Sequence, residues 1–559
     1  MLYTLGLVLL SLAWLLPGHF YPWTSFQQDA LAAGGIGLVA LGAAIGDSRW
    51  PARAPWIAVG ALALALVPAL QFATGLLRFH LDALLPASYL AGLALAIVAG
   101  HQLARQDPRF VPALWGAIGL GGIASFGIAL VQWAQLGSVP FVEPVAVSER
   151  ISGNLLQPNQ LASLFGVALA ATLGAFEMRR IGPWTAALAA AAFGVGMVMT
   201  QSRAPWLFAA ATLILWALLR RRATLRTPPA AVVLGAALFI CAVLAFDRIN
   251  GLLEAGQAAH SIASRLQPGY RLVHWATLWD GLMRQPWTGY GWLQVPQAQA
   301  AATLDHPPTF EFLIASHNQL LDLLLWNGLP LGLLVIAALA WWSISRLRQC
   351  NDGGTFALWL GLAYLFMHSL VEFPLQYSYI LLPAGLMIGA IEAGTPSTHG
   401  QGVPIGRASF LAAWGAMAAL LVGMVFEYAK LEESVRRARM VEARFFGARA
   451  EAFVPDIHLL DWQREYVRFN LTEPRAGMSA EELAWMRALA ARYPSPGALS
   501  RLARASALNG QPAEAERALR LLCHTSPEKH CNASRQMWDE LARTQPALAA
   551  VPFPPTPAR

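Results

Sequence analysis

Charged residues are scarce in this chain of 559 residues. They make up 13% of the sequence, and hydrophobic residues make up 56%, whereas ordinary soluble domains carry roughly 25% charged residues. This composition excludes an ordinary soluble protein. Lysine is almost missing, with only Lys430 and Lys529, so arginine carries nearly all the positive charge. The net charge of +7 is explained by basic loops beside a membrane, and no nucleic-acid partner is expected.

Cysteine is also scarce, since four residues are too few for a disulfide framework. Cys241 lies in a hydrophobic run and Cys350 in a short basic loop, so both are interpreted as inert single thiols. Cys523 and Cys531 are close in sequence, and a disulfide between them is open if that side of the membrane is oxidising. No Cys/His spacing is typical of a zinc site, and neither a metal nor a cofactor is expected.

The hydrophobic residues form long runs separated by short polar segments, the pattern of a polytopic membrane protein. Thirteen runs are expected to cross the membrane, at about 2–16, 30–46, 56–74, 83–100, 111–135, 156–176, 183–200, 204–219, 229–247, 318–343, 355–370, 376–392 and 409–427. The predicted fold class is therefore an all-α polytopic membrane protein with about 13 transmembrane helices.

The arginines predict the orientation of these helices. Thirteen basic residues fall in loops on the side of the N-terminus: Arg49, Arg53, Arg105, Arg109, Arg179, Arg180, Arg220, Arg221, Arg222, Arg226, Arg346, Arg348 and Arg407. The short loops on the other side hold only Arg78, Arg150 and Arg203. Because basic loops stay in the cytoplasm, the N-terminus is predicted to be cytoplasmic and the C-terminal tail periplasmic.

Two domains are expected. Residues 1–428 form a transmembrane catalytic domain that includes a long periplasmic loop, 248–317, and residues 429–559 form a helical periplasmic domain. Within this tail, 480–491 has an amphipathic helical pattern, and two further helices flank the turn from Asn509 to Pro512. Small alanines at their crossing are similar to a tetratricopeptide hairpin, so a small repeat-like helical domain is predicted.

With this topology, the unusual polar groups all fall on the outer face, and that convergence predicts a site there. The groups are His19, Gln157 and Asn159, Arg203, Arg265, Arg271 and His274, His317 to Gln319, and Glu372 with Tyr377. Each also has a structural alternative. Gln157 and Asn159 could begin a helix, Arg203 could reach lipid phosphates, and His19 and Glu372 could be packing residues. Trp23, Trp275, Trp287 and Trp292 fit either an interfacial belt or sugar stacking.

The chemistry of these groups suits transfer from a lipid diphosphate to a hydroxyl. Guanidinium groups at Arg203 and Arg271 can bind diphosphate oxygens bidentately. His317 can accept a proton near neutral pH. Since the outer face offers no acidic pair to hold a divalent metal, a metal-independent reaction is predicted.

These motifs together resemble the bacterial O-linked protein oligosaccharyltransferases (pilin glycosylation ligases), within the O-antigen ligase and polymerase superfamily. The residues that carry the resemblance are His19 with Pro22 to Phe26, Gly153 to Ala162, Gln201 to Arg203, Arg271 with Trp275 through Gly291, Ser316 through Gly328, and Val371 to Tyr377. Their order and topology are the specific signal, and Gln376 departs from the bulky residue expected there.

The resemblance implies an inverting glycosyltransferase of the GT-C type at the periplasmic face of the bacterial inner membrane. It would move a preassembled glycan from undecaprenyl diphosphate to a serine or threonine of pilin or another exported protein. His317 matches the essential loop histidine, and Arg203 and Arg271 match basic positions associated with the diphosphate. Supporting or substrate-binding roles are expected for Gln157, Asn159, Asn318, Gln319, Glu372, Tyr377, Arg265 and His19.

Two other functions remain open. An O-antigen ligase or polymerase would use the same groups on a lipid or glycan acceptor, but the large tail favours a protein acceptor. A transporter is less expected, because transporters place polar groups near the middle of the bilayer, whereas here they gather on one face.

Overall fold

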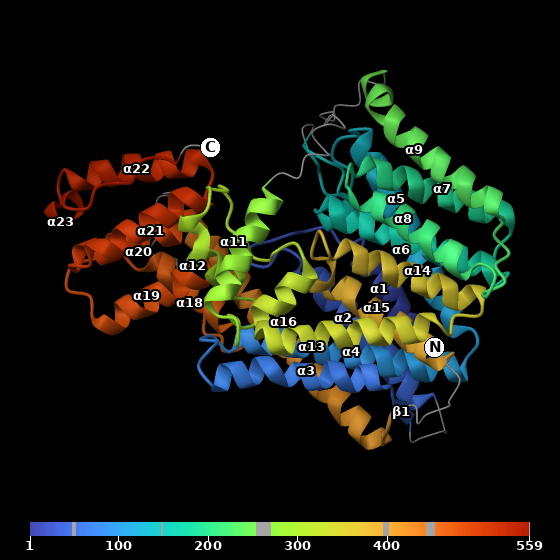
Figure 1. Cartoon of the computed structure of the whole chain (residues 1–559). Coiled ribbons are helices and arrows are strands. Elements are labelled where there is room, and N and C mark those ends of the chain that lie inside the picture. The colour runs from blue at the N-terminus through green and yellow to red at the C-terminus, as the bar shows by residue number, and fades with distance from the viewer. Residues whose placement is uncertain (47–51, 147–148, 253–269, 395–401, 443–452, 558–559) are drawn as a thin grey trace. The chain divides into compact units, whose positions relative to one another are not determined.

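The computed structural model describes residues 1–46, 52–146, 149–252, 270–394, 402–442 and 453–557. Helices dominate this part of the chain, as predicted. Within it, the only strands are β1 (Ala52–Ala54) and β2 (Val403–Ile405), which pair antiparallel with Ala52 opposite Ile405. The helices are α1 (Leu2–Ala13), α2 (Phe26–Ile45), α3 (Trp56–Ala73), α4 (Leu81–Gln106), α5 (Phe110–Trp133), α6 (Pro158–Glu177), α7 (Pro183–Met199), α8 (Ala204–Leu219), α9 (Pro229–Leu252), α11 (Arg271–Arg284), α12 (Val295–Ala302), α13 (Gln319–Leu347), α14 (Gly353–His368), α15 (Ser378–Ala393), α16 (Arg407–Glu442), α18 (Asp461–Leu471), α19 (Ala480–Arg492), α20 (Pro496–Leu508), α21 (Pro512–Thr525), α22 (Glu528–Ala542) and α23 (Pro546–Ala549) (Figure 1).

Among the described helices, eight are long and apolar enough to cross a membrane: α2, α3, α4, α5, α6, α9, α13 and α16. Shorter apolar helices of 10–17 residues are α1, α7, α8 and α15. These twelve helices and α14 each overlap one of the hydrophobic runs expected to span the membrane, so every such run contains a helix. The chain is therefore a multi-pass membrane protein, and the count of thirteen spans stays a prediction.

Contacts group the chain into two compact units. The first contains Met1–Leu66, Ala87–Gln267 and Leu339–Gly423, and the second contains Val67–Pro86, Pro268–Ala338 and Met424–Arg559. The second unit thus joins the long loop to the C-terminal tail, although several hydrophobic helices separate them in sequence. The predicted domain boundary at 428 follows chain order, whereas the compact units divide the chain by contacts.

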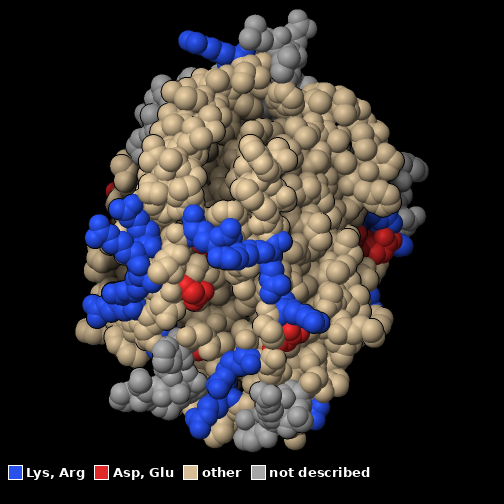
Figure 2. Space-filling view, turned by 90° about the vertical axis from the view of Figure 1, so that its right-hand side faces the viewer, with Lys and Arg blue, Asp and Glu red and all other residues tan. Residues whose placement is uncertain are grey.

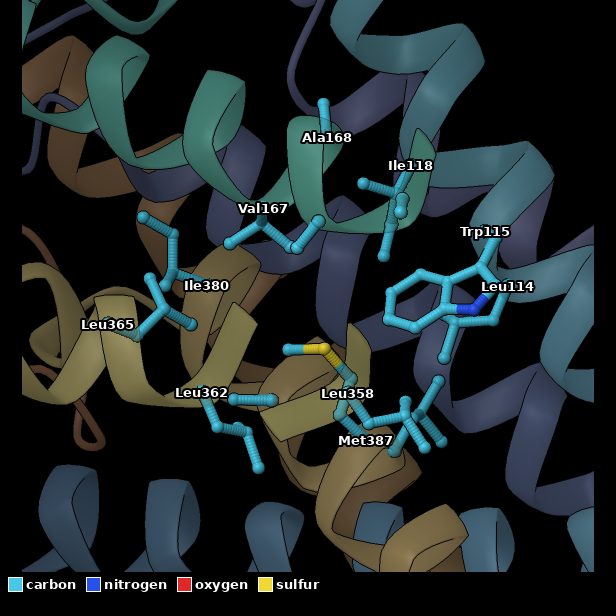
Figure 3. Close-up of a cluster of buried hydrophobic side chains, with 14 of the residues drawn as sticks. Leu114, Trp115, Ile118, Val167, Ala168, Leu358, Leu362, Leu365, Ile380 and Met387 are labelled. Atoms are coloured by element: carbon cyan, nitrogen blue, oxygen red, sulfur yellow. The ribbon is translucent and has the colours of Figure 1, made fainter. Parts of the chain in front are cut away.

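The first unit has a continuous apolar core. Figure 3 shows part of it, with Leu114, Trp115 and Ile118 from α5, Val167 and Ala168 from α6, Leu358, Leu362 and Leu365 from α14, and Ile380 and Met387 from α15. Small residues allow the closest helix contacts. At Gly389 in α15, a Cβ atom would come within 2.2 Å of the Ile97 carbonyl oxygen in α4, so only glycine fits there.

Arginine-rich loops meet at one end of the helices of the first unit. Arg222, after α8, donates to the carbonyl of Arg348 at 2.7 Å, and Arg346 pairs with Glu392 at 2.7 Å. The β1–β2 ribbon joins the loop after α2 to the segment before α16. Figure 2 shows Lys and Arg gathered on this face of the molecule. The basic loops predicted to share one side of the membrane therefore lie together, and the side itself stays a prediction.

The second unit is tied together by a buried ion pair. The Nε atom of Arg492 in α19 lies 2.8 and 2.9 Å from the two carboxylate oxygens of Asp82 in α4. Gln294, just before α12, donates to the same carboxylate at 2.9 Å. The Arg492 guanidinium also lies 4.9 Å from the centre of the Trp462 ring. The start of α4, the long loop and the tail thus converge on one carboxylate.

The long loop is also fixed to α13, whose helical path breaks at Gly328 with a φ of +74°. The turn before α12 fills the break, because the Leu329 N–H donates to the Pro286 carbonyl and the Tyr290 N–H to the Leu325 carbonyl, each at 2.7 Å. A Cβ atom at 328 would lie 2.3 Å from the Trp287 carbonyl oxygen. Glycine is therefore required for this close approach.

The tail contains the hairpin expected from its sequence. Helices α20 and α21 flank the turn, where Gly510 has a φ of +72°. Cys523 and Cys531 form a disulfide, with an S–S distance of 1.99 Å. The cystine packs against Ala300 and Leu304 of the long loop, so it supports the contact between loop and tail. The tetratricopeptide likeness stays a prediction.

Candidate active site

His317 lies in the second unit, two residues before Gln319, the first residue of α13. Its backbone has a φ of +56°, in the left-handed region that residues other than glycine seldom adopt. Its side chain is partly buried. Asn318 caps the helix that follows, because its Oδ1 accepts the N–H groups of Leu320 and Leu321 at 3.1 and 3.3 Å. Asn318 therefore places the predicted base at the start of α13, and Gln319 is the first residue of that helix.

The first turn of α11 brings basic groups near His317. Arg271 begins the helix, and His274 follows one turn later with only 5% of its surface exposed. Burial, together with the nearby His317 and Arg271, lowers the pKa of His274 to about 4. Because burial and positive neighbours both disfavour the charged ring, His274 is neutral at neutral pH. Its buried Nε2 has no hydrogen-bond partner within the described structure.

In the first unit, the start of α6 is bound to the segment before α8. Gln157 caps α6, since its Oε1 accepts the Asn159 N–H at 2.6 Å with Pro158 in the first turn. The Asn159 Oδ1 in turn accepts the Ser202 hydroxyl at 2.6 Å. Arg203 follows directly and is exposed. Gln157 and Asn159 thus have the capping geometry considered from the sequence, and they also fix the turn that carries Arg203.

His19 is held between two backbone carbonyls. Its Nδ1 lies 2.7 Å from the Thr24 oxygen and its Nε2 lies 2.8 Å from the Asn154 oxygen. Asn154 is itself buried, and its Nδ2 donates to the carbonyls of Leu15 and Phe141 at 2.7 and 2.8 Å. With both ring nitrogens facing acceptors, His19 joins the segment after α1 to the segment before α6. This geometry favours the packing role that the sequence left open.

Glu372 and Tyr377 lie in the turn between α14 and α15. Glu372 is buried, with its N–H donating to the His368 carbonyl at 2.9 Å. The end of this turn is anchored by Asp29 of α2, whose Oδ1 accepts the N–H and the hydroxyl of Ser378 at 2.7 and 2.8 Å. Both predicted residues therefore occupy a turn of fixed shape.

The predicted site residues thus form two groups, one in each compact unit. The second unit brings together Arg271, His317, Asn318 and Gln319, and the first contains His19, Gln157, Asn159, Arg203, Glu372 and Tyr377. Arg265 lies outside the described residues. Within those residues, no three or more His, Cys, Asp or Glu side chains gather in a way that could hold a metal ion. Metal independence stays a prediction.

Several residues around the site receive no definite role from the sequence alone. His274 is among the outer-face groups predicted to form the site, and it follows Arg271 at helical spacing on the same face, but the sequence assigns it no role. Trp292 was considered for a belt or for sugar stacking, but it is buried and stacks on Trp326 with ring centres 4.6 Å apart. Trp275 donates to the Ser316 carbonyl at 2.9 Å. Asp29 has no signal beyond being an acidic residue directly before the hydrophobic run 30–46.

Within the second unit, Arg271 supplies a fixed positive charge and His317 a ring nitrogen that can take up a proton. Within the first unit, Arg203 supplies a fixed positive charge. Arg271 and Arg203 both stand at the N-terminal end of a helix, where the helix dipole also favours an anion. His317 is partly buried beside a neutral His274 rather than beside another charged ring. These features suit an anionic leaving group and a nucleophile that must lose a proton.

Comparison with known proteins agrees with this chemistry. Residues 187–337 match a family model described as O-Antigen ligase, and residues 356–538 match one described as virulence factor membrane-bound polymerase, C-terminal. A General O-oligosaccharyltransferase of Acinetobacter baylyi is 30% identical over 417 residues, which cover 72% of each chain. The chain belongs to the O-oligosaccharyltransferase family.

A second O-oligosaccharyltransferase of the same organism, described as ComP-specific, is 27% identical over 327 residues, covering 58% of this chain and 59% of its own. No solved structure matches the chain. The O-antigen ligase match contains Arg203, Arg271 and His317, and the polymerase match contains Glu372, Tyr377 and most of the tail. The two arginines, His317, Glu372 and Tyr377 therefore fall within the matched regions, whereas His19, Gln157 and Asn159 lie before them.

Proposed function

We propose that this chain transfers an oligosaccharide in one piece from undecaprenyl diphosphate to a serine or threonine of an exported protein such as pilin. The reaction takes place at the periplasmic face of the bacterial inner membrane, with the N-terminus in the cytoplasm. Membership of the O-oligosaccharyltransferase family supports the reaction class. The proximity of both His317 and Arg271 to His274, in one compact unit, is the observation that supports the choice of site residues.

In the proposed mechanism, the acceptor hydroxyl gives its proton to His317 while its oxygen attacks the anomeric carbon of the glycan. The bond between that carbon and the phosphate oxygen breaks, and the configuration at the carbon inverts. Undecaprenyl diphosphate leaves with its charge balanced by Arg203 and Arg271, without a metal ion. Preorganised cations near the developing charge are an effective way to stabilise such a transition state. The proton on His317 then passes to water.

The remaining predicted residues take supporting roles in this proposal. Asn318 caps α13 directly after the base, Gln319 begins that helix, and Gln157 and Asn159 hold the turn of Arg203. Glu372, Tyr377 and Arg265 complete the substrate surroundings, and His19 supports the first unit by joining two of its backbone segments. Membrane lipid surrounds the apolar helices, so the donor reaches the site from the bilayer.

An O-antigen ligase or polymerase is the second candidate, because the two family models that match carry those descriptions. The two functions differ in the acceptor, and the disulfide-linked tail that packs on the long loop favours a protein acceptor. The test is to supply one lipid-linked glycan to membranes containing this chain together with either a purified pilin or lipopolysaccharide core. Glycan on the pilin supports the proposal, and glycan on the core alone refutes it.

The two arginines provide a test of the donor site. Arg203→Lys or Arg271→Lys keeps the charge but removes the planar fork, and losing one charged hydrogen bond worth about 1.5–3 kcal/mol should slow transfer roughly 10- to 100-fold. Arg180→Lys, in an exposed loop at the opposite end of α6 from Asn159, is the matched control and should transfer normally. Normal transfer by both site variants would refute the diphosphate role.

A further inference from the structure

Ser316, the residue before His317, is held through both of its backbone polar groups. The N–H of Ser316 donates to Oδ1 of Asp322 at 2.9 Å, and the carbonyl of Ser316 accepts the indole N–H of Trp275 at 2.9 Å. Asp322 belongs to α13 and Trp275 to α11, so two different helices hold one residue. Ser316 and Asp322 are 1% and 0% exposed. In such a buried place, each of these hydrogen bonds is costly to break.

The peptide that follows His317 is held by Ser316 itself. The Ser316 hydroxyl donates to the Asn318 carbonyl at 2.8 Å and accepts the Asn318 N–H at 3.1 Å. His317, the one residue between them, has the left-handed φ of +56°, a conformation that costs roughly 1–2 kcal/mol for a residue with a Cβ. The hydrogen bonds around it offset that cost and hold the backbone of His317 in this conformation.

Asp322 is not needed to begin α13. The Asn318 Oδ1 already accepts the first free N–H groups of the helix, and the Asp322 N–H makes an ordinary helical bond to the Asn318 carbonyl at 2.9 Å. The carboxylate of Asp322 instead reaches back to the residue before His317. A buried carboxylate is expensive to desolvate, so its hydrogen bond to the Ser316 N–H is a strong constraint on the position of the loop.

The segment of the loop before Ser316 is also held by hydrogen bonds, to the tail and to α12. The Phe310 N–H donates to the His524 carbonyl of the tail at 2.9 Å. Gln299 of α12 donates to the Glu311 carbonyl at 2.9 Å and accepts the Leu313 N–H at 2.8 Å. Asp322 and Trp275 then fix the last peptide before the histidine.

We propose that Asp322 and Trp275 are positioning residues that hold the His317 imidazole in its reactive orientation through the backbone of Ser316. Neither residue acts on the substrate. The proposal rests on the proposed function of His317 as the base. An error of about 1 Å in the place of a reacting group can cost about 100-fold in rate, which is the effect expected when one side of this support is removed.

The test compares Asp322→Ala with Asp322→Asn in a transfer assay with purified protein. The asparagine oxygen can still accept the Ser316 N–H, so Asp322→Asn should keep most of the activity. Asp322→Ala should lower kcat roughly 100-fold with KM for the donor little changed. Trp275→Phe, which loses only the indole N–H, should lower kcat in the same way. Ser479→Ala, which removes the capping box of α19 in the same unit, is the control and should transfer normally.

A double variant separates this proposal from the proposed function. If Asp322 acts through His317, adding Asp322→Ala to His317→Ala should lower the remaining activity little further. Normal kcat in Asp322→Ala beside an inactive His317→Ala would overturn the positioning role and leave the base in place. Full activity in His317→Ala would overturn the base itself. Equal loss of activity and of thermal stability in Asp322→Ala and Asp322→Asn would show a merely structural carboxylate and overturn the positioning role.

Discussion

Replacing Arg492 with methionine should destabilise the second unit strongly. Arg492 and Asp82 are 9% and 1% exposed, so the substitution leaves a buried carboxylate without its counter-charge. Breaking such a pair typically costs about 3–5 kcal/mol. Gln294 still donates to the carboxylate, which places the expected loss near the lower end, at about 3 kcal/mol.

The loss can be followed by the tryptophan fluorescence of the purified protein during heating in detergent. A change of about 3 kcal/mol corresponds to a fall in Tm of roughly 6–12 °C for a unit of this size. Arg475→Met is the matched control, because Arg475 pairs with Glu482 in the same tail with side chains 57% and 33% exposed. An exposed pair contributes about 0–1 kcal/mol, so the control should shift Tm by no more than a few degrees.

Removing both charges gives the sharper comparison. Asp82→Leu combined with Arg492→Met leaves no buried charge, and this double variant should recover much of the lost Tm. Transfer activity should fall with Tm in the single variant, since the loop that carries His317 belongs to the same unit. A single variant as stable as Arg475→Met, or a double variant as unstable as the single one, would refute the reasoning.

Two further predictions concern the same unit. As the pH falls from about 6.5 to about 4, the unfolded chain protonates His274 at its ordinary pKa, whereas the buried ring, whose pKa is lowered to about 4, stays neutral. Stability should therefore fall over this range by at most about 3 kcal/mol, and His274→Asn should have a flatter dependence of Tm on pH; equal slopes would contradict this. Gly328→Ala places a Cβ atom 2.3 Å from the Trp287 carbonyl oxygen. It should lower the free energy of unfolding by about 2–4 kcal/mol, and both Tm and transfer activity should fall. In the control Gly415→Ala in α16, the added Cβ meets nothing within 4 Å, so neither Tm nor transfer activity should fall.

Much of the helical architecture is predictable from local patterns. Each hydrophobic run contains a helix, because a run of apolar residues in a membrane protein has few other ways to satisfy its backbone. The turn from Asn509 to Gln511 is recognised by its glycine and the proline that follows. The position of Asn318 before an apolar run likewise predicts a helix start at α13.

The grouping of the long loop with the tail, unlike the helices, cannot be predicted from local sequence patterns. It depends on pairs such as Asp82 with Arg492 and Phe310 with His524, which are far apart in sequence and leave no local pattern. The break at Gly328 is equally hidden, since a glycine inside an apolar helix is common in membranes.

The candidate site shows the same limit. Arg271 and His317 could be selected by residue type and topology, because few side chains on that face can bind a diphosphate or accept a proton. The role of Asp322 could not, since it depends on a hydrogen bond from the backbone N–H of Ser316. An acidic residue one turn inside a helix suggests a side-chain partner, and the sequence carries no information on which backbone group lies within reach.

The most direct test of the proposed function is intact mass spectrometry of an exported pilin produced together with this chain and its lipid-linked glycan. The unaltered chain should add the mass of the glycan to the pilin. His317→Ala, at equal abundance in the membrane, should leave the pilin at its unmodified mass. Glycan addition by His317→Ala to the same extent as by the unaltered chain would contradict the account.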